Sequence, residues 1–187
     1  MNTDTSIAAA HSVLGQSEQL LDAEAVVAAL GRVAAGINHA LHTETVRPLA
    51  LVLMRGGLVF AGQLLTRIEV PVDIDYVDAS RYGGATRGGE ILWRTPVPAS
   101  VAGRTVLIVD DVLDEGITLA AVKAAVLSAG AHRALIAVFA EKRLARPKPV
   151  AADFCGVTLP DRYVFGYGMD VKGLWRNLPA VYALRES

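Results

Sequence analysis

The sequence predicts an α/β protein with a central, mainly parallel five-stranded sheet flanked by helices. Three consecutive segments lead to this prediction. The first is the β-branched run TVLIVDD (105–111), and the second is a helical pattern from Thr118 to about Ala129 that ends at Gly130. A further apolar run, ALIAVFA (134–140), follows directly. A strand, a helix and a strand at this spacing form a βαβ unit, in which a crossover helix joins two parallel strands.

Apolar periodicity predicts the other elements of the core. A long helix is expected from Asp22 to about His42, because apolar residues recur there at intervals of three or four positions. These residues are Val26, Leu30, Val33, Ile37 and Leu41. After Pro48, the short apolar run LALVLM (49–54) predicts a buried strand. The remaining expected elements are a helix at 58–67 and strands at VDIDYV (72–77) and ILWR (91–94).

The chain is expected to fold as one domain over residues 1–187. Residues 1–15 are small and polar without a clear period, which predicts a flexible tail. Residues 78–90 are rich in Gly, Arg, Ser and Thr, and they lie between two expected strands, which predicts a mobile lid loop. The short segments in 150–187, DFCGVTL, YVFGYG and VYAL, are expected to form a small hood over the core together with the other end of the chain.

Composition excludes several classes of protein. The 18 Lys and Arg residues nearly balance the 19 Asp and Glu residues, so a net charge of −1 argues against a nucleic-acid-binding polycation. With 52% hydrophobic and 20% charged residues, the chain is typical of a folded protein. The single Cys155 forms no intrachain disulfide. Neither a signal peptide nor an apolar run of ~18 residues is evident, so a cytoplasmic location is expected.

The segment VLIVDDVLDEGITL (106–119) contains the residues with clear chemical meaning. Asp110 and Asp111 end an expected parallel strand, at the edge where open α/β sheets bind ligands. Two adjacent carboxylates repel each other, and a divalent cation or the hydroxyls of a ribose would relieve that repulsion. The following residues, 114–118, form a turn that opens into a helix, where backbone N–H groups and the helix dipole favour a phosphate monoester.

Two common nucleotide-binding motifs, GxxxxGK[ST] and GxGxxG before a helix, are absent. The pattern found instead is an apolar strand, two acids, two apolar residues and Asp-x-Gly-x-Thr, and it resembles the type I phosphoribosyltransferases. A receiver-like domain also ends a strand with an acidic pair, but near the start of its chain, whereas this pair lies past the midpoint. The segments MRGG (54–57), AEKR (140–143), PDRYVFGYGMD (160–170) and WRNLP (175–179) narrow the resemblance to hypoxanthine-guanine phosphoribosyltransferases.

This resemblance covers residues 45–187 and implies the type I phosphoribosyltransferase fold. By similarity, Asp110 and Asp111 bind the ribose hydroxyls of phosphoribosyl pyrophosphate and its Mg²⁺, and Asp170 binds a second Mg²⁺. Asp114 is implied as the catalytic general base near N7 of the purine. The residues implied in binding phosphoribosyl pyrophosphate are Arg55, Gly56, Asp110, Asp111, Asp114, Glu115, Gly116, Ile117, Thr118 and Arg176.

The resemblance also implies a purine site that includes residues of the base-binding region 150–187. Lys142 corresponds to a lysine that hydrogen-bonds the 6-oxo group, although a lysine at a strand end is otherwise an ordinary solvated residue. Tyr163 corresponds to an aromatic residue that stacks on the base. Val164 corresponds to a residue whose backbone contacts the edge of the base, and Asp170 is also implied in purine binding.

The implied activity is purine salvage. Magnesium-dependent transfer of the phosphoribosyl group from phosphoribosyl pyrophosphate to hypoxanthine or guanine gives IMP or GMP and pyrophosphate. A homo-oligomer, a dimer or a tetramer, without nucleic-acid or membrane partners is expected. Two alternatives stay open: a xanthine-preferring enzyme, and a nucleotide-sensing RNA-binding regulator of the same fold, which the charge of −1 disfavours.

Three positions depart from the pattern of the family. Arg81 precedes Tyr82 where a Ser-Tyr pair is common, so an arginine contact to pyrophosphate is expected from the lid. Glu115 replaces a frequent threonine of the phosphate turn, and only its backbone is expected to take part, because a carboxylate beside a phosphate is unfavourable. Arg55 replaces a frequent lysine. Family members often have a cis peptide bond at the position of Met54–Arg55.

Overall fold

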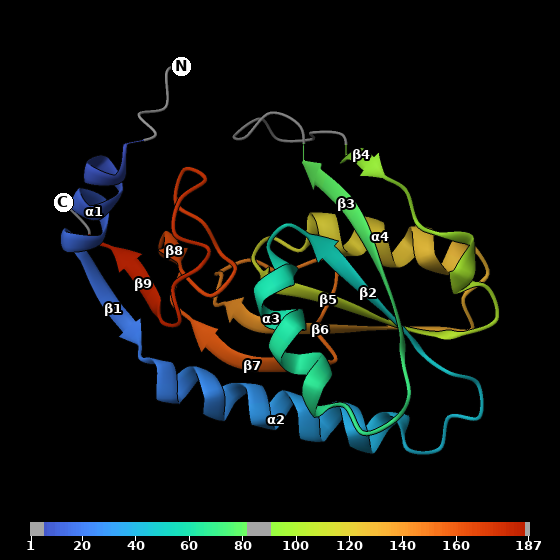
Figure 1. Ribbon diagram of the computed structural model, residues 1–187. Coiled ribbons are helices and arrows are strands. Elements are labelled where there is room, and N and C mark those ends of the chain that lie inside the picture. Colours follow the sequence, from blue (N-terminus) through green and yellow to red (C-terminus); the bar gives the residue numbers. More distant parts are fainter. Residues whose placement is uncertain (1–5, 82–90, 186–187) are drawn as a thin grey trace.

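A computed structural model describes residues 6–81 and 91–185 of the chain. Its centre is a six-stranded sheet in the order β4-β3-β2-β5-β6-β7, in which β4 is antiparallel to β3 and the other neighbours are parallel (Figure 1). The prediction of an α/β fold with a mainly parallel sheet is confirmed. The strands are β2 (Leu49–Met54), β3 (Asp73–Arg81), β4 (Ile91–Thr95), β5 (Thr105–Leu113), β6 (Arg133–Lys142) and β7 (Phe154–Leu159).

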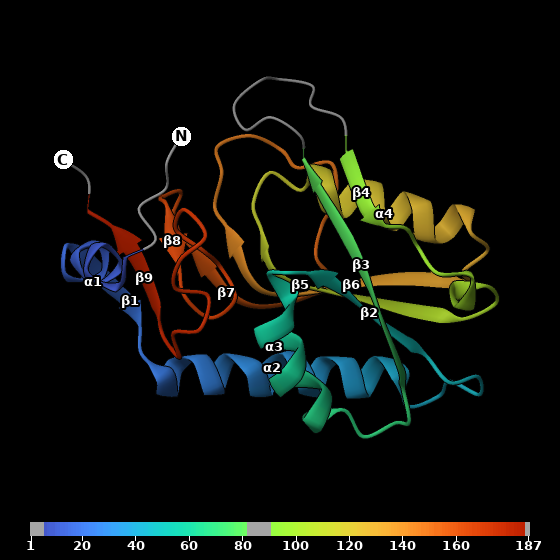
Figure 2. The same cartoon turned by 45° about the horizontal axis from the view of Figure 1, so that its top comes forward.

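Helices cover both faces of the sheet, as the apolar character of its strands requires. Helices α2 (Ala23–Leu41) and α3 (Gly57–Leu64) pack on one face, and α4 (Ile117–Ser128) packs on the other (Figures 1 and 2). Alternate residues of β5 divide between these layers, since Leu107 and Val109 join the α2 and α3 side while Val106 and Ile108 join the α4 side. Short 3₁₀ turns, η1 (Leu65–Arg67) and η2 (Ala99–Val101), complete the connections.

The two ends of the chain meet in a second, antiparallel sheet of order β1-β9-β8, which forms the expected hood. Its strands are β1 (Ser17–Leu21), β8 (Val164–Phe165) and β9 (Val181–Leu184). In Figure 2 this sheet lies beside the β7 edge of the central sheet, close to one end of α2. No helix in the described residues, 6–81 and 91–185, is both long and apolar enough to cross a membrane.

Part of the predicted flexible tail at 1–15 is folded, so that prediction is wrong for residues 7–15. They form helix α1 (Ile7–Gly15), whose first turn is capped by the side chain of Ser6. The indole of Trp175 donates a hydrogen bond to the carbonyl of Ala10 at 2.7 Å, and its ring stacks on His11. The helix buries none of its residues completely, so packing against the core does not hold it in place.

Two other boundaries need correction. DFCGVTL was assigned to the hood at 150–187, but β7 pairs in parallel with β6 and adds a sixth strand to the central sheet. β7 lies at the edge of the sheet and is only half buried, so its sequence does not need the continuous apolar run of the neighbouring strands. The predicted lid at 78–90 begins too early, because residues 78–81 belong to β3 and pair with β4. The rest of that lid, 82–90, lies outside the described residues.

The N-terminus of α2 offers a test of the fold. The carboxylate of Asp22 accepts a hydrogen bond from the N–H of Ala25 at 2.8 Å and so caps the helix. We expect Asp22→Ala to lower the free energy of unfolding by about 1 kcal/mol, because an N–H of the first turn loses its acceptor. Asp22→Ser should retain most of the stability, as measured by urea unfolding. Equal stabilities of the Ala and Ser variants would contradict the capping role.

Candidate active site

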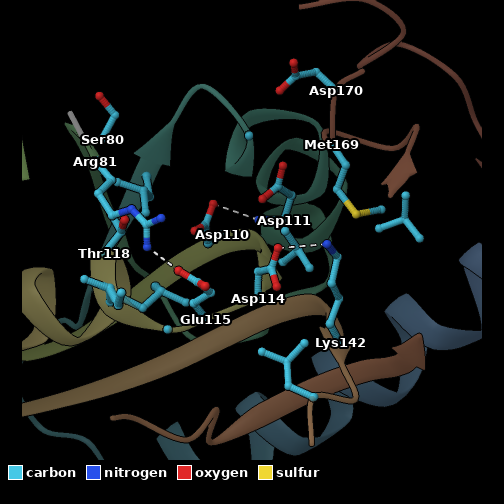
Figure 3. A pocket seen from close by; sticks show the side chains of 18 of the residues that line it. Ser80, Arg81, Asp110, Asp111, Asp114, Glu115, Thr118, Lys142, Met169 and Asp170 are labelled. Atoms are coloured by element: carbon cyan, nitrogen blue, oxygen red, sulfur yellow. Dashed lines mark hydrogen bonds and ion pairs between the residues drawn. The ribbon is translucent and has the colours of Figure 1, made fainter. Parts of the chain in front are cut away.

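All fourteen predicted site residues line one cavity of about 920 Å³ at the carboxyl edge of the parallel strands (Figure 3). This volume lies within the range of pockets that bind small molecules, ~300–1,000 Å³. The ends of β2, β5 and β6 provide its floor, and the hood provides one wall. The fourteen residues are Arg55, Gly56, Asp110, Asp111, Asp114, Glu115, Gly116, Ile117, Thr118, Lys142, Tyr163, Val164, Asp170 and Arg176.

Asp110 and Asp111 are the most unusual groups of this cavity because both are buried, with exposures of 8% and 7%. They lie on β5, which pairs with β2 on one side and β6 on the other. Burial raises the pKa of both carboxyls, and the neighbouring charge of Asp111 raises the pKa of Asp110 further. The N–H of Asp111 donates to Oδ1 of Asp110 at 2.9 Å. A cation at this position would stabilise the ionised forms.

Arg176 is the cation closest to this pair in the described residues. Its Nη1 lies 3.8 Å from Oδ2 of Asp111 and donates to the carbonyl of Gly168 at 2.6 Å. Its Nη2 forms an ion pair with Asp170. Asp170 in turn accepts a hydrogen bond from the N–H of Gly173 at 2.6 Å. Arg176 therefore connects Asp170 with Asp111, two residues that are predicted to bind different Mg²⁺ ions.

The carboxylates of the cavity are the groups that could bind a divalent cation. No group of three or more His, Cys, Asp or Glu side chains within residues 6–81 and 91–185 is placed to hold a metal alone. Mg²⁺ needs no such group, because it is commonly bound by one or two carboxylates together with substrate phosphates and water. The cavity lining includes five cationic side chains and six carboxylates, so the lining itself provides no surplus of positive charge for a phosphorylated ligand. Asp110 and Asp111 fit this mode of Mg²⁺ binding.

The turn between β5 and α4 has the geometry of an anion site. Gly116, with φ of +81°, adopts the left-handed conformation that directs the chain into the helix. α4 has no side-chain cap, and the first N–H groups of a helix have no acceptor within it. Thr118 lies in the first turn of α4 and lines the cavity with Gly116 and Ile117. Backbone amides at such a helix start bind phosphate.

Only the backbone of Glu115 is predicted to take part in ligand binding, and in the structure its side chain is held by two arginines. Its carboxylate forms ion pairs with Arg81 at the end of β3 and with Arg146 in the loop after β6. The hydrogen bond from Arg81 is the main cause that lowers the pKa of Glu115. Figure 3 shows the side chains of Arg81 and Glu115 pointing towards each other beside Thr118. Two arginines thus neutralise the carboxylate whose charge made its presence at a phosphate turn unfavourable.

Asp114 and Lys142 form the opposite side of the cavity. Nζ of Lys142 lies 2.8 Å from Oδ2 of Asp114, and the lysine side chain is 14% exposed whereas the aspartate is 45% exposed. Tyr163 is half exposed at the start of the hood, and Val164 is buried beside it. A hydrogen-bonding ion pair and an exposed aromatic ring therefore lie in the same cavity as the turn between β5 and α4.

Lys148 was not predicted from the sequence as a residue of the site. It links β5 and β6, the strands that position Asp114 and Lys142. Its Nζ donates to the carbonyls of Leu113 at 2.9 Å and Lys142 at 2.6 Å, and it pairs with Glu141 at 3.0 Å. Lys148 thereby joins the end of β5 at Leu113, next to Asp114, to the end of β6 at Lys142. Nothing in the local sequence signals this role, because a lysine between two prolines has no recognisable pattern. The role depends on which strands become neighbours.

The turn after β2 lies close to the acidic pair. The peptide bond between Met54 and Arg55 is cis, as the resemblance implied. A Cβ atom added at Gly56 would collide with the carboxylate of Asp111, and one added at Gly168 would collide with the carbonyl of Gly56. Both positions therefore need glycine for the close approach of three chain segments around Asp111.

Comparison with known proteins identifies the class of protein that these features define. Residues 16–172 match the family described as the phosphoribosyl transferase domain, and the chain belongs to this family. Its similar relatives include the hypoxanthine-guanine phosphoribosyltransferase of Bacillus subtilis strain 168, which is 34% identical over 139 residues, 74% of this chain and 77% of that protein. The enzyme of the same name from Lactococcus lactis is 34% identical over 145 residues, 76% of this chain and 78% of that protein.

Solved structures agree with this relationship. A hypoxanthine phosphoribosyltransferase from Staphylococcus aureus superimposes with a TM-score of 0.84 at 27% identity, and the match covers 97% of this chain and 96% of that chain. A variant of the Trypanosoma cruzi enzyme in a ternary substrates complex gives a TM-score of 0.82 at 28% identity, covering 91% and 97%. The resemblance proposed from the sequence is confirmed, and so is the type I phosphoribosyltransferase fold.

The buried acidic pair leads to a prediction about stability and pH. A carboxyl whose pKa is raised by folding stabilises the protein at low pH, and this contribution is lost as the pH rises through the raised pKa. We therefore expect Asp110→Asn to raise the free energy of unfolding at neutral pH, in buffer without divalent cations, by ~0.5–2 kcal/mol. The gain should shrink as the pH is lowered, because the aspartate then becomes neutral as well.

Urea unfolding at neutral and acidic pH measures this difference. Asp161→Asn is the matched control, since Asp161 is an exposed carboxylate that lines the same cavity, and it should give no such gain. A stability difference for Asp110→Asn that does not vary with pH would contradict the electrostatic explanation.

Proposed function

We propose that this protein transfers the phosphoribosyl group from phosphoribosyl pyrophosphate to N9 of hypoxanthine or guanine, with Mg²⁺, to give IMP or GMP and pyrophosphate. The reaction serves purine salvage. The named relatives support the reaction class. The cytoplasmic location and the homo-oligomeric state expected from the sequence stay predictions.

One observation supports this function above others: the phosphate turn, the acidic pair and the Asp114–Lys142 ion pair line a single cavity. The substrate has the corresponding groups, namely a 5′-phosphate, ribose hydroxyls with a pyrophosphate, and a purine as acceptor. A site for the phosphate alone would not require a lysine and an exposed aromatic ring at its other end. The arrangement therefore supports a reaction between a phosphorylated sugar and a planar base.

The chemical problem is the positive charge that develops at C1′ of the ribose as pyrophosphate leaves. The turn after β2, with the guanidinium of Arg55, would bind the departing pyrophosphate, and Arg176 would add a second cation. Asp110 and Asp111 would hold Mg²⁺, and the bound ion would supply Lewis-acid neutralisation of the leaving group.

The base would be oriented by Lys142, Tyr163 and Val164. The ammonium of Lys142 would donate to the 6-oxo group, which distinguishes hypoxanthine and guanine from adenine. The ring of Tyr163 would stack on the purine, a contact that contributes ~1–3 kcal/mol in nucleic-acid sites. Asp114, next to Lys142, would accept the proton from the purine N7 as N9 attacks C1′.

The direct test is to incubate the protein with Mg²⁺, phosphoribosyl pyrophosphate and one base at a time, and to measure the nucleotide formed. Hypoxanthine and guanine should react, and adenine should not. Xanthine as the best substrate would instead support the xanthine-preferring alternative. Adenine as the best substrate would contradict the role of Lys142.

Replacement of Asp114 tests the general base. Asp114→Asn should lower kcat by ~10²–10⁴, the usual contribution of such a group, while the affinity for phosphoribosyl pyrophosphate stays nearly unchanged. Steady-state kinetics and calorimetric binding separate the two quantities. Asp161→Asn removes a negative charge from the same cavity and should leave kcat within a factor of about two. Full turnover by the Asp114 variant would disprove the assignment.

Replacement of Gly56 tests the packing around Asp111. Gly56→Ala places a Cβ against the Asp111 carboxylate and should displace it, lowering kcat/KM for phosphoribosyl pyrophosphate by about a hundredfold. Gly62→Ala is the matched control, because a Cβ at this exposed position of α3 meets no atom within 4 Å. Unchanged kinetics in Gly56→Ala would show that the close approach is not needed.

A further inference from the structure

Glu115 is bound by two arginines that come from distant parts of the chain. Arg81 is the last residue of β3 and contacts the carboxylate through Nη1, and Arg146 follows β6 and contacts it through Nη2. Both arginines line the principal cavity together with Gly116 and Thr118 of the phosphate turn. Three chain segments therefore place two guanidinium groups beside the amides of this turn.

The stability of the fold does not explain this cluster. The side chains of Arg81, Glu115 and Arg146 are 27%, 33% and 62% exposed, and ion pairs with this degree of exposure contribute little to folding. A glutamate at a phosphate turn also repels the ligand. This repulsion is overcome only if the ion-pair partners of Glu115 add more positive charge at the turn than the glutamate adds negative charge. Arg81 and Arg146 together with Glu115 have a net charge of +1, so this condition is met.

We propose that Arg81 and Arg146 bind the phosphate held by the turn 114–118, and that Glu115 is a positioning residue that orients both guanidinium groups towards it. A guanidinium has five N–H donors, and a carboxylate bound through one nitrogen leaves others for a phosphate oxygen. Glu115 therefore fixes the arginines and does not compete for them. The inference rests on the proposed function only in that the substrate contains such a phosphate.

The alternative role for Glu115 predicts the opposite effect of its removal. If the carboxylate merely competed with phosphate for the arginines, Glu115→Gln would free both cations and tighten phosphate binding. If the carboxylate positions them, the same variant weakens binding even though the cavity becomes more positive. The sign of this change separates the two roles, and simple charge counting predicts the wrong sign for a positioning residue.

Calorimetric titration of the full-length protein with inorganic phosphate, ribose 5-phosphate and, with Mg²⁺, phosphoribosyl pyrophosphate tests the proposal. We expect Arg81→Ala and Arg146→Ala each to weaken the binding of all three ligands by about tenfold, the loss of one charge-assisted hydrogen bond. Glu115→Gln should weaken binding about threefold, less than removal of an arginine. Arg143→Ala is the matched control, because Arg143 is an exposed cation that lines only the neighbouring cavity.

Several results would overturn the proposal. The proposal is wrong if both arginine variants bind phosphate with unchanged affinity, or if Glu115→Gln binds phosphate more tightly. It is also wrong if Arg143→Ala loses as much phosphate affinity as the two arginine variants, or if the unaltered protein binds no phosphate. Thermal unfolding confirms that each variant is folded.

The outcome is distinguishable from a failure of the proposed function. An unaltered protein that forms no nucleotide but binds phosphate through Arg81 and Arg146 would refute the transferase and leave this inference standing. An active enzyme whose arginine variants bind phosphate normally would do the reverse.

Discussion

The burial of two adjacent carboxylates at the end of β5 is the constraint on which the rest of the site depends. β5 lies between β2 and β6 and is covered by helices on both faces, so Asp110 and Asp111 leave water when the sheet forms. Such charges are stable only where the surroundings compensate them. Arg176, which lies 3.8 Å from Asp111, supplies part of this compensation, and the glycines at 56 and 168 leave the space that the buried carboxylate of Asp111 occupies.

The cavity balances its charges in pairs before any ligand binds. Lys142 pairs with Asp114 at the base end, and Arg176 pairs with Asp170 near the acidic couple. This arrangement keeps each long cationic side chain in place, so less conformational entropy is lost when a substrate arrives. A neutral protein can thereby bind a highly charged sugar phosphate without a basic surface that would attract other polyanions.

The sequence was sufficient for the parts of the molecule that depend on local pattern. Elements with strong periodicity, such as α2 and β5, were predicted within a few residues. The motif that ends β5 and the four shorter segments that resemble the family located the predicted residues of the cavity lining. The sequence was insufficient where contacts between distant segments determine which elements form and where they lie. β7 was assigned to the wrong sheet because an edge strand has a weak apolar pattern, and α1 was missed because Trp175, far along the chain, holds it. The partners of Glu115 and Lys148 lie on other strands and in the loop after β6, and no local pattern encodes which of these segments become neighbours.

The pairing of β1 with β9 has a consequence for the order in which the protein folds. Ser17 lies opposite Leu184, so the hood joins two segments that are far apart in the sequence. The βαβ core pairs segments that are close in the sequence, whereas pairings over long sequence distances form slowly. During refolding, the turn between β5 and α4 is therefore expected to form before the hood closes beside it.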